Sequence, residues 1–176
     1  MKKILLAVVA LLVVGSCIFM FKISPVGKTE KVIEVKNREM PVANATTDEL
    51  TKGLVVSEEF TNTTENINEI AVVFTRNYLL DEKDASNTLA IELLDGNKVL
   101  ASTTVITNDI PDQHRVYVYP TSPIAGMVGK KLTLKVYDNS GCDTGVSLMI
   151  DNTYNSSFKF GTSKQDGTIC FSITGE

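Results

Sequence analysis

Short apolar segments separated by turn residues run from residue 55 to the end of the chain. They recur at a spacing of roughly 8 to 14 positions, which is typical of an all-β sandwich or barrel. No stretch in this region keeps a helical period over about 12 residues, so we expect few and short helices. The expected strands are Val55–Phe60, Glu69–Phe74, Thr88–Leu94, Lys98–Ile106, His114–Tyr119, Lys131–Tyr137, Val146–Ile150, Ser157–Gly161 and Thr168–Thr174.

Alternation within these segments assigns side chains to the two faces of each strand, because residues two apart share a face. Leu132, Leu134 and Val136 form one expected core set, and Ile169, Phe171 and Ile173 form another. Asp95-Gly96-Asn97 predicts a tight hairpin turn, since Gly and Asn tolerate positive φ. The expected fold is an all-β, two-sheet antiparallel β-sandwich, jelly-roll-like, with 8 or 9 strands.

The N-terminal segment Ile4–Phe21 carries no charge and is flanked by Lys2, Lys3 and Lys22. Its length is at the lower end of the roughly 17 to 25 residues that span a bilayer. We expect residues 1–22 to form a transmembrane anchor, with the C-terminal domain outside the cytoplasm. Two alternatives remain open. Val14-Gly15-Ser16-Cys17 also fits a lipoprotein cleavage box that would lipidate Cys17 at the same membrane face, and the segment would otherwise be a cleaved secretion signal.

The remainder divides by composition into a linker over residues 23–50 and a folded domain over 51–176. The linker is rich in charged and turn-forming residues, which favours a mobile stalk, and residues 30–39 have the composition of a short helix. Without Lys2, Lys3 and Lys22 the chain keeps 14 basic residues against 21 acidic ones, a net charge of −7. That sign disfavours nucleic acid as a partner.

Residues that commonly carry catalysis are sparse. His114 is the only histidine, which leaves little material for a metal site or a catalytic triad. Five aspartates of the domain lie beside turn residues, where short carboxylates stabilise turns by accepting from their own backbone. These are Asp95, Asp112, Asp138, Asp143 and Asp151. We therefore expect no enzyme and no cofactor. A structural calcium bound by some of these loop carboxylates is the alternative, although no loop has the regular ligand spacing that would favour it.

Two cysteines, Cys142 and Cys170, lie in the domain expected outside the cytoplasm. A disulfide between them is permitted in that compartment. It would close a loop of roughly 29 residues and contribute about 3 to 4 kcal/mol. Cys142 falls in a turn and Cys170 in mid-strand, so two free thiols remain the alternative.

Several short sequence features occur in an order that resembles a known bacterial domain. They are Phe60, Asn66-Ile67-Asn68-Glu69-Ile70, Phe74-Thr75-Arg76-Asn77, Leu89–Asp95, Ile110-Pro111-Asp112, Tyr119-Pro120, Ser122-Pro123-Ile124, Gly129-Lys130 and Gly167–Phe171. The chain resembles the β-sandwich accessory domain, similar to galactose-binding and carbohydrate-binding modules, of membrane glycosyltransferases and polysaccharide-assembly proteins. The resemblance implies a β-sandwich that contacts cell-surface glycan or an assembly partner, and it carries over no binding residues.

Carbohydrate recognition uses an aromatic face for the C–H side of a sugar ring and polar groups for its hydroxyls. Trp is absent. The candidate ligand-binding residues are therefore Tyr117 and Tyr119, with Arg76 and Asn77 as polar partners. Tyr117 and Tyr119 share a strand face opposite Val116 and Val118, so one of the two pairs must point outward. We expect a membrane-tethered, non-catalytic module that binds envelope glycan, or else a structural subunit of a membrane protein complex.

Overall fold

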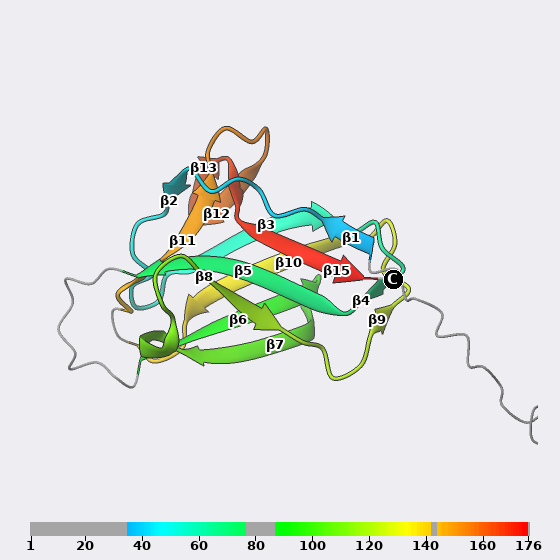
Figure 1. Cartoon of the computed structure of the whole chain (residues 1–176), viewed down its shortest axis with the longest axis horizontal. Coiled ribbons are helices and arrows are strands. Elements are labelled where there is room, and N and C mark those ends of the chain that lie inside the picture. The colour runs from blue at the N-terminus through cyan, green and yellow to red at the C-terminus, as the bar shows by residue number, and fades with distance from the viewer. Residues whose placement is uncertain (1–34, 77–86, 142–143, 176) are drawn as a thin grey trace, which may run out of the picture. The chain divides into compact units, whose positions relative to one another are not determined.

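The computed structural model describes residues 35–76, 87–141 and 144–175, with side chains described from Arg38 onward. All of these residues belong to a compact unit that spans residues 33–176. The described residues form antiparallel strands and a single 3₁₀ turn (Figure 1). The elements are β1 (Val35–Arg38), β2 (Ala45–Thr46), β3 (Val55–Thr61), β4 (Asn66–Ile67), β5 (Glu69–Arg76), β6 (Thr88–Asp95), β7 (Lys98–Ile106), η2 (Thr107–Asp109), β8 (His114–Val118), β9 (Ile124–Ala125), β10 (Lys131–Asp138), β11 (Val146–Asp151), β12 (Ser157–Phe160), β13 (Ser163–Asp166), β14 (Thr168–Ile169) and β15 (Phe171–Gly175).

The six-stranded sheet has the order β13-β12-β3-β10-β6-β7. Leu132, Leu134 and Val136 on β10 are fully buried, as the alternation predicts. Strands β6 and β7 form the expected hairpin, in which Asp95 pairs with Lys98 and Gly96 adopts a φ of +58°. Glycine adopts this left-handed conformation without the steric cost that a Cβ imposes.

The seven-stranded sheet has the order β1-β15-β5-β11-β14, with β2 on β11 and β8 on β5. Its central strand β5 pairs with β8 along one edge and with β15 and β11 along the other. The predicted strand Thr168–Thr174 is divided into β14 and β15 at Cys170. Its expected core residues Ile169, Phe171 and Ile173 are nevertheless fully buried.

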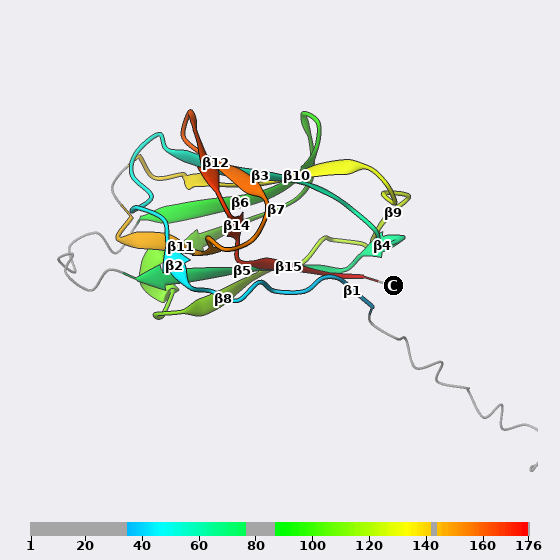
Figure 2. The ribbon, with the colours of Figure 1, turned by 90° about the horizontal axis from the view of Figure 1, so that it is seen from above.

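One hydrophobic cluster takes residues from both large sheets, including Leu132 and Leu134 of β10 and Ile70, Val72 and Phe74 of β5. In Figure 2, β3 and β10 lie in one layer while β5, β8 and β15 lie in another. A short pair, β4 with β9, forms a third sheet. Burial of this cluster is the main source of stability, because each large apolar side chain contributes about 1.5 to 3 kcal/mol when buried.

The described part of the expected linker is folded, which differs from the expectation of a mobile stalk with a short helix. Strand β1 pairs with β15, and β2 pairs with β11. Leu50 is fully buried in the main core. Met40 packs on a small cluster of Val73, Met149 and Cys170. These strands are stabilised by pairing with distant parts of the chain, so their own polar composition does not exclude them from the fold.

No helix among the described residues has the length and apolar character needed to cross a membrane. The predicted anchor at residues 1–22 and the lipidation candidate Cys17 lie outside the described residues.

Candidate functional site

Tyr117 and Tyr119 point outward from β8 and the residue that follows it. Their exposed fractions are 41% and 64%, whereas Val116 and Val118 are buried at 8% and 1%. The two rings are nearly parallel, with an interplanar angle of 13° and centroids 6.1 Å apart. Alternation left open which pair faces solvent, and the structure shows that it is the tyrosines. Their two aligned aromatic rings lie on the surface.

Glu69 is the acidic neighbour of this tyrosine pair. Partial loss of hydration and the nearby Glu69 carboxylate raise the pKa of the Tyr119 phenol. An exposed aromatic ring with a nearby carboxylate combines an apolar face with a hydrogen-bond acceptor.

A groove of about 250 Å³ adjoins Tyr119. One side is β7, which contributes Val99 and Ser102, and the other is formed by Tyr119, Pro120 and Thr121. Among the described strands, β7 is the last of its sheet and β8 pairs only with β5. The groove therefore lies between two sheet edges and offers hydroxyl groups beside the exposed ring.

The structure does not bring Arg76 to the tyrosines. Its guanidinium donates to the Asn108 backbone carbonyl at 3.0 Å and to the Asn108 side-chain oxygen at 2.7 Å. Tyr117 pairs with Ala71, five residues away along β5, or roughly 17 Å at the usual strand rise. Arg76 thus holds the η2 turn, and Asn77 lies outside the described residues.

Two of the predicted turn aspartates, Asp138 and Asp151, accept hydrogen bonds within their own turns, whereas Asp95 accepts from the distant Lys130 and Asp112 from the distant Thr75. Asp138 accepts from the Ser140 amide and hydroxyl and from the Gly141 amide. Asp151 accepts from the Thr153 hydroxyl and amide, and these bonds are the main reason that its pKa is lowered. Within the ranges that the structure describes, no group of three or more His, Cys, Asp or Glu residues could hold a metal ion.

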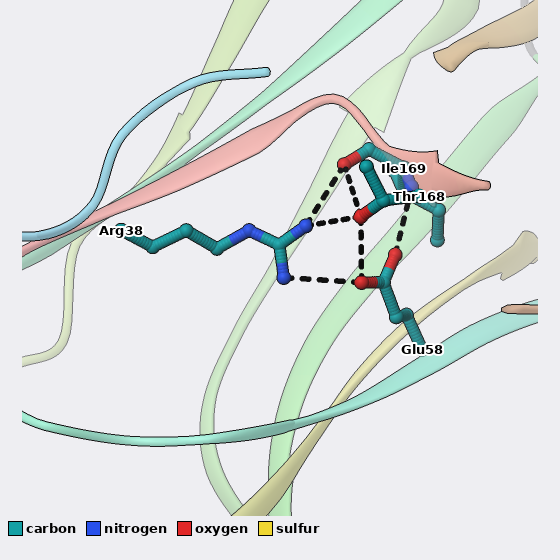
Figure 3. Close-up of polar contacts among 4 residues, drawn as sticks. All are labelled: Arg38, Glu58, Thr168 and Ile169. Atoms are coloured by element: carbon teal, nitrogen blue, oxygen red, sulfur yellow. Dashed lines mark hydrogen bonds and ion pairs between the residues drawn. The ribbon is translucent and has the colours of Figure 1, made fainter. Parts of the chain in front are cut away.

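A buried polar network joins β1, β3 and β14 (Figure 3). Glu58 is only 2% exposed and accepts from the Arg38 guanidinium at 3.0 Å, the Thr168 hydroxyl at 2.7 Å and the Ile169 amide at 2.7 Å. The guanidinium also donates to Thr168 and lies 3.7 Å above the Phe171 ring centre. Both oxygens of the buried carboxylate accept hydrogen bonds, and the network links β1 and β14 of the seven-stranded sheet to β3 of the six-stranded sheet.

The sequence analysis did not identify this network, although the strand pattern indicates that Glu58 is buried. Val56, Glu58 and Phe60 share one strand face by alternation, which places a carboxylate among core positions. A buried carboxylate requires a partner. The partner Arg38 lies in the segment expected to be a linker, so the pairing was not deducible from spacing.

Cys170 is fully buried and is a free thiol in the structure. Burial raises its pKa to about 11, and the Asp151 carboxylate adds to the increase. Cys142 lies outside the described residues, so the disulfide between the two stays a prediction.

Comparison of the chain with protein-family models and with curated proteins found no match. The assignment of a functional site therefore depends on the geometry of the described residues. The exposed tyrosine pair and its groove are the strongest candidate among the residues that the sequence singled out.

Proposed function

We propose that this chain is a membrane-tethered, extracytoplasmic recognition module that binds carbohydrate without catalysis. The fold would be a jelly-roll-like β-sandwich, and residues 1–22 would be its transmembrane anchor, with lipidation at Cys17 as the alternative tether. The observation that carries the proposal is the pair of parallel, solvent-exposed rings of Tyr117 and Tyr119 beside a groove.

The chemistry of this surface suits a neutral sugar. The apolar C–H side of a sugar ring packs on an aromatic face, and its hydroxyls need polar groups nearby. Glu69 beside Tyr119 supplies an acceptor, while Ser102 and Thr121 in the groove supply hydroxyl groups that donate or accept. Both tyrosines belong to or directly follow a strand, so little backbone freedom is lost on binding.

The second candidate is a structural subunit of a membrane protein complex without glycan binding. It is favoured by Val99, which is 46% exposed and lies with Tyr119 along the same groove. Tyrosine is enriched at the centres of protein interfaces, where it supplies much of the binding energy. On this alternative, the tyrosine pair would dock on a protein surface.

A glycan array probed with the full-length chain in a nonionic detergent tests the proposal. We expect binding to at least one envelope polysaccharide, reduced at least tenfold by Tyr119→Ala. Tyr154→Ala is the matched control, because Tyr154 is 55% exposed and lies outside the groove. Absence of binding to any glycan, or equal losses in the two variants, would refute the glycan function. Capture of a membrane protein that depends on Tyr119 would favour the second candidate.

A further inference from the structure

The outer face of the six-stranded sheet carries a row of lysines across neighbouring strands. Lys164 of β13 pairs with Lys159 of β12, which pairs with Ser57 of β3, which pairs with Lys135 of β10. Neighbouring strands are about 4.8 Å apart, so this row spans only a few strand widths. Lys159 and Lys164 face outward, because the adjacent Phe158 points into the core at 3% exposure.

Like charges directly opposite each other destabilise a strand pair. Lys135 is relieved by an ion pair with Glu92 at 3.5 Å. Among the described residues, neither Lys159 nor Lys164 has a carboxylate within ion-pair distance. The β12–β13 hairpin therefore keeps an uncompensated positive pair on a chain whose net charge is −4.

These two lysines line a groove of about 400 Å³ on the outer face of the sheet. Small hydroxyl residues, Ser57, Thr133 and Ser157, line the same groove. The one carboxylate on its lining, Glu59, pairs with Lys131 at 3.1 Å. The groove thus combines two unpaired ammonium groups with hydroxyl donors.

The nearest carboxylate on the hairpin is Asp166, which pairs with Ser157 across the two strands. Asp166 lines a different groove, of about 290 Å³, together with Phe160 and Gln165. Because Asp166 does not line the groove with Lys159 and Lys164, that groove stays open to an external anion.

We propose that the groove between Lys159, Lys164 and the Ser57–Thr133 surface binds an oxyanion, either a carboxylate or a phosphate, carried by an anionic polymer. Ammonium groups at cross-strand spacing contact successive oxyanions or one shared oxyanion, and the hydroxyls donate to the remaining oxygens. The site lies on the other large sheet from Tyr117 and Tyr119, and the proposal does not depend on carbohydrate binding there.

Fluorescence anisotropy with labelled polymers and the full-length chain in a nonionic detergent tests this site. The probes are polygalacturonate for carboxylates, polyphosphate for phosphates and dextran as the neutral control. Binding of either anionic polymer, weakened by added salt, is expected, and the polymer that binds identifies the source of the oxyanion. The Lys159→Gln and Lys164→Gln double variant should bind about tenfold more weakly, as expected for the loss of two exposed charge contacts.

The matched control is the Lys52→Gln and Lys98→Gln double variant, which changes net charge equally at two exposed lysines outside the groove. It should bind within about twofold of the wild type. Thermal melting of the Lys159→Gln and Lys164→Gln variant should show unchanged or higher stability, because a repulsive pair is removed. Equal weakening in both double variants, or no binding of either anionic polymer at low salt, would overturn the proposal.

Discussion

Removal of the Arg38 cation should destabilise the domain substantially, because it leaves the buried Glu58 carboxylate without its countercharge. Breaking a buried ion pair by removing one partner costs about 3 to 5 kcal/mol. Glu58 keeps its bonds from Thr168 and Ile169, and the Arg38 side chain is 18% exposed, so water reaches part of the site. We therefore expect Arg38→Ala to lower the free energy of unfolding by about 3 kcal/mol, near the lower end of that range.

Urea denaturation followed by circular dichroism measures this loss. The corresponding fall in melting temperature is about 9 °C for a domain of this size. Lys131→Ala is the control, because the Lys131–Glu59 pair has side chains that are 73% and 61% exposed. An exposed ion pair contributes about 0 to 1 kcal/mol. A loss from Arg38→Ala that is no larger than the loss from Lys131→Ala would refute the reasoning.

A double-mutant cycle separates the ion pair from the packing of the arginine stem. Arg38→Met keeps much of the apolar stem, and Glu58→Gln keeps an acceptor for the Thr168 hydroxyl. The two changes together should cost at least about 1 kcal/mol less than the sum of the single changes. Additive losses would mean that Arg38 acts through its contact with Phe171 and not through the carboxylate.

Three further outcomes are expected. Gly167 has a φ of +105°, and an added Cβ would lie 2.6 Å from a backbone oxygen. Gly167→Ala should therefore lower the melting temperature well beyond Gly96→Ala, whose Cβ would meet nothing within 4 Å; equal shifts would contradict this. After reduction, the buried Cys170 thiol, whose pKa is about 11, should resist iodoacetamide at pH 8 until urea unfolds the chain, and rapid labelling of the folded chain would disprove it. In an alkaline absorbance titration, the Tyr119 phenol should ionise above its ordinary pKa, and Glu69→Gln should shift that step to lower pH; a step that Glu69→Gln leaves in place would exclude Glu69 as a cause.

The strands that the sequence predicted are those with local alternation or continuous apolar runs. The β10 strand extends over Lys131–Asp138, one residue beyond its expected range, because Leu132, Leu134 and Val136 fix both its period and its buried face. Strands of two residues, such as β4 and β9, are too short to have a period. Their positions follow from pairing with each other, which local sequence does not reveal.

Segment 35–50 shows the limit of compositional reasoning most clearly. Few large apolar residues occur there, so the segment cannot build a core of its own. It is nonetheless held by β1 on β15, by β2 on β11 and by the Arg38–Glu58 contact. All of these partners are distant in sequence, so the free energy that orders the segment comes from contacts that only the tertiary structure defines.

The candidate sites also depend partly on local sequence pattern and partly on contacts between segments that are distant in sequence. Strand alternation placed Tyr117 and Tyr119 on one face, and only the burial of Val116 and Val118 identified that face as the outer one. Arg76 was grouped with them by proximity along the chain, yet β5 carries it away from the tyrosine rings. The opposition of Lys159 and Lys164 follows from the β12–β13 register. That register could not be predicted from the sequence, because the two strands have only four residues each.

The two proposed surfaces differ in the physical term that would drive binding, and this difference makes them separable. The tyrosine pair offers apolar ring area, whose contribution changes little with salt because it does not depend on charge. The lysine pair offers Coulomb attraction, which salt weakens as the Debye length shortens from about 30 Å at 0.01 M to about 8 Å at 0.15 M. Both pairs are held by strand pairing, Tyr117 opposite Ala71 and Lys159 opposite Lys164, so neither surface has to form when a ligand arrives. The salt dependence of binding therefore distinguishes a ligand held at the lysine pair from one held at the tyrosine pair.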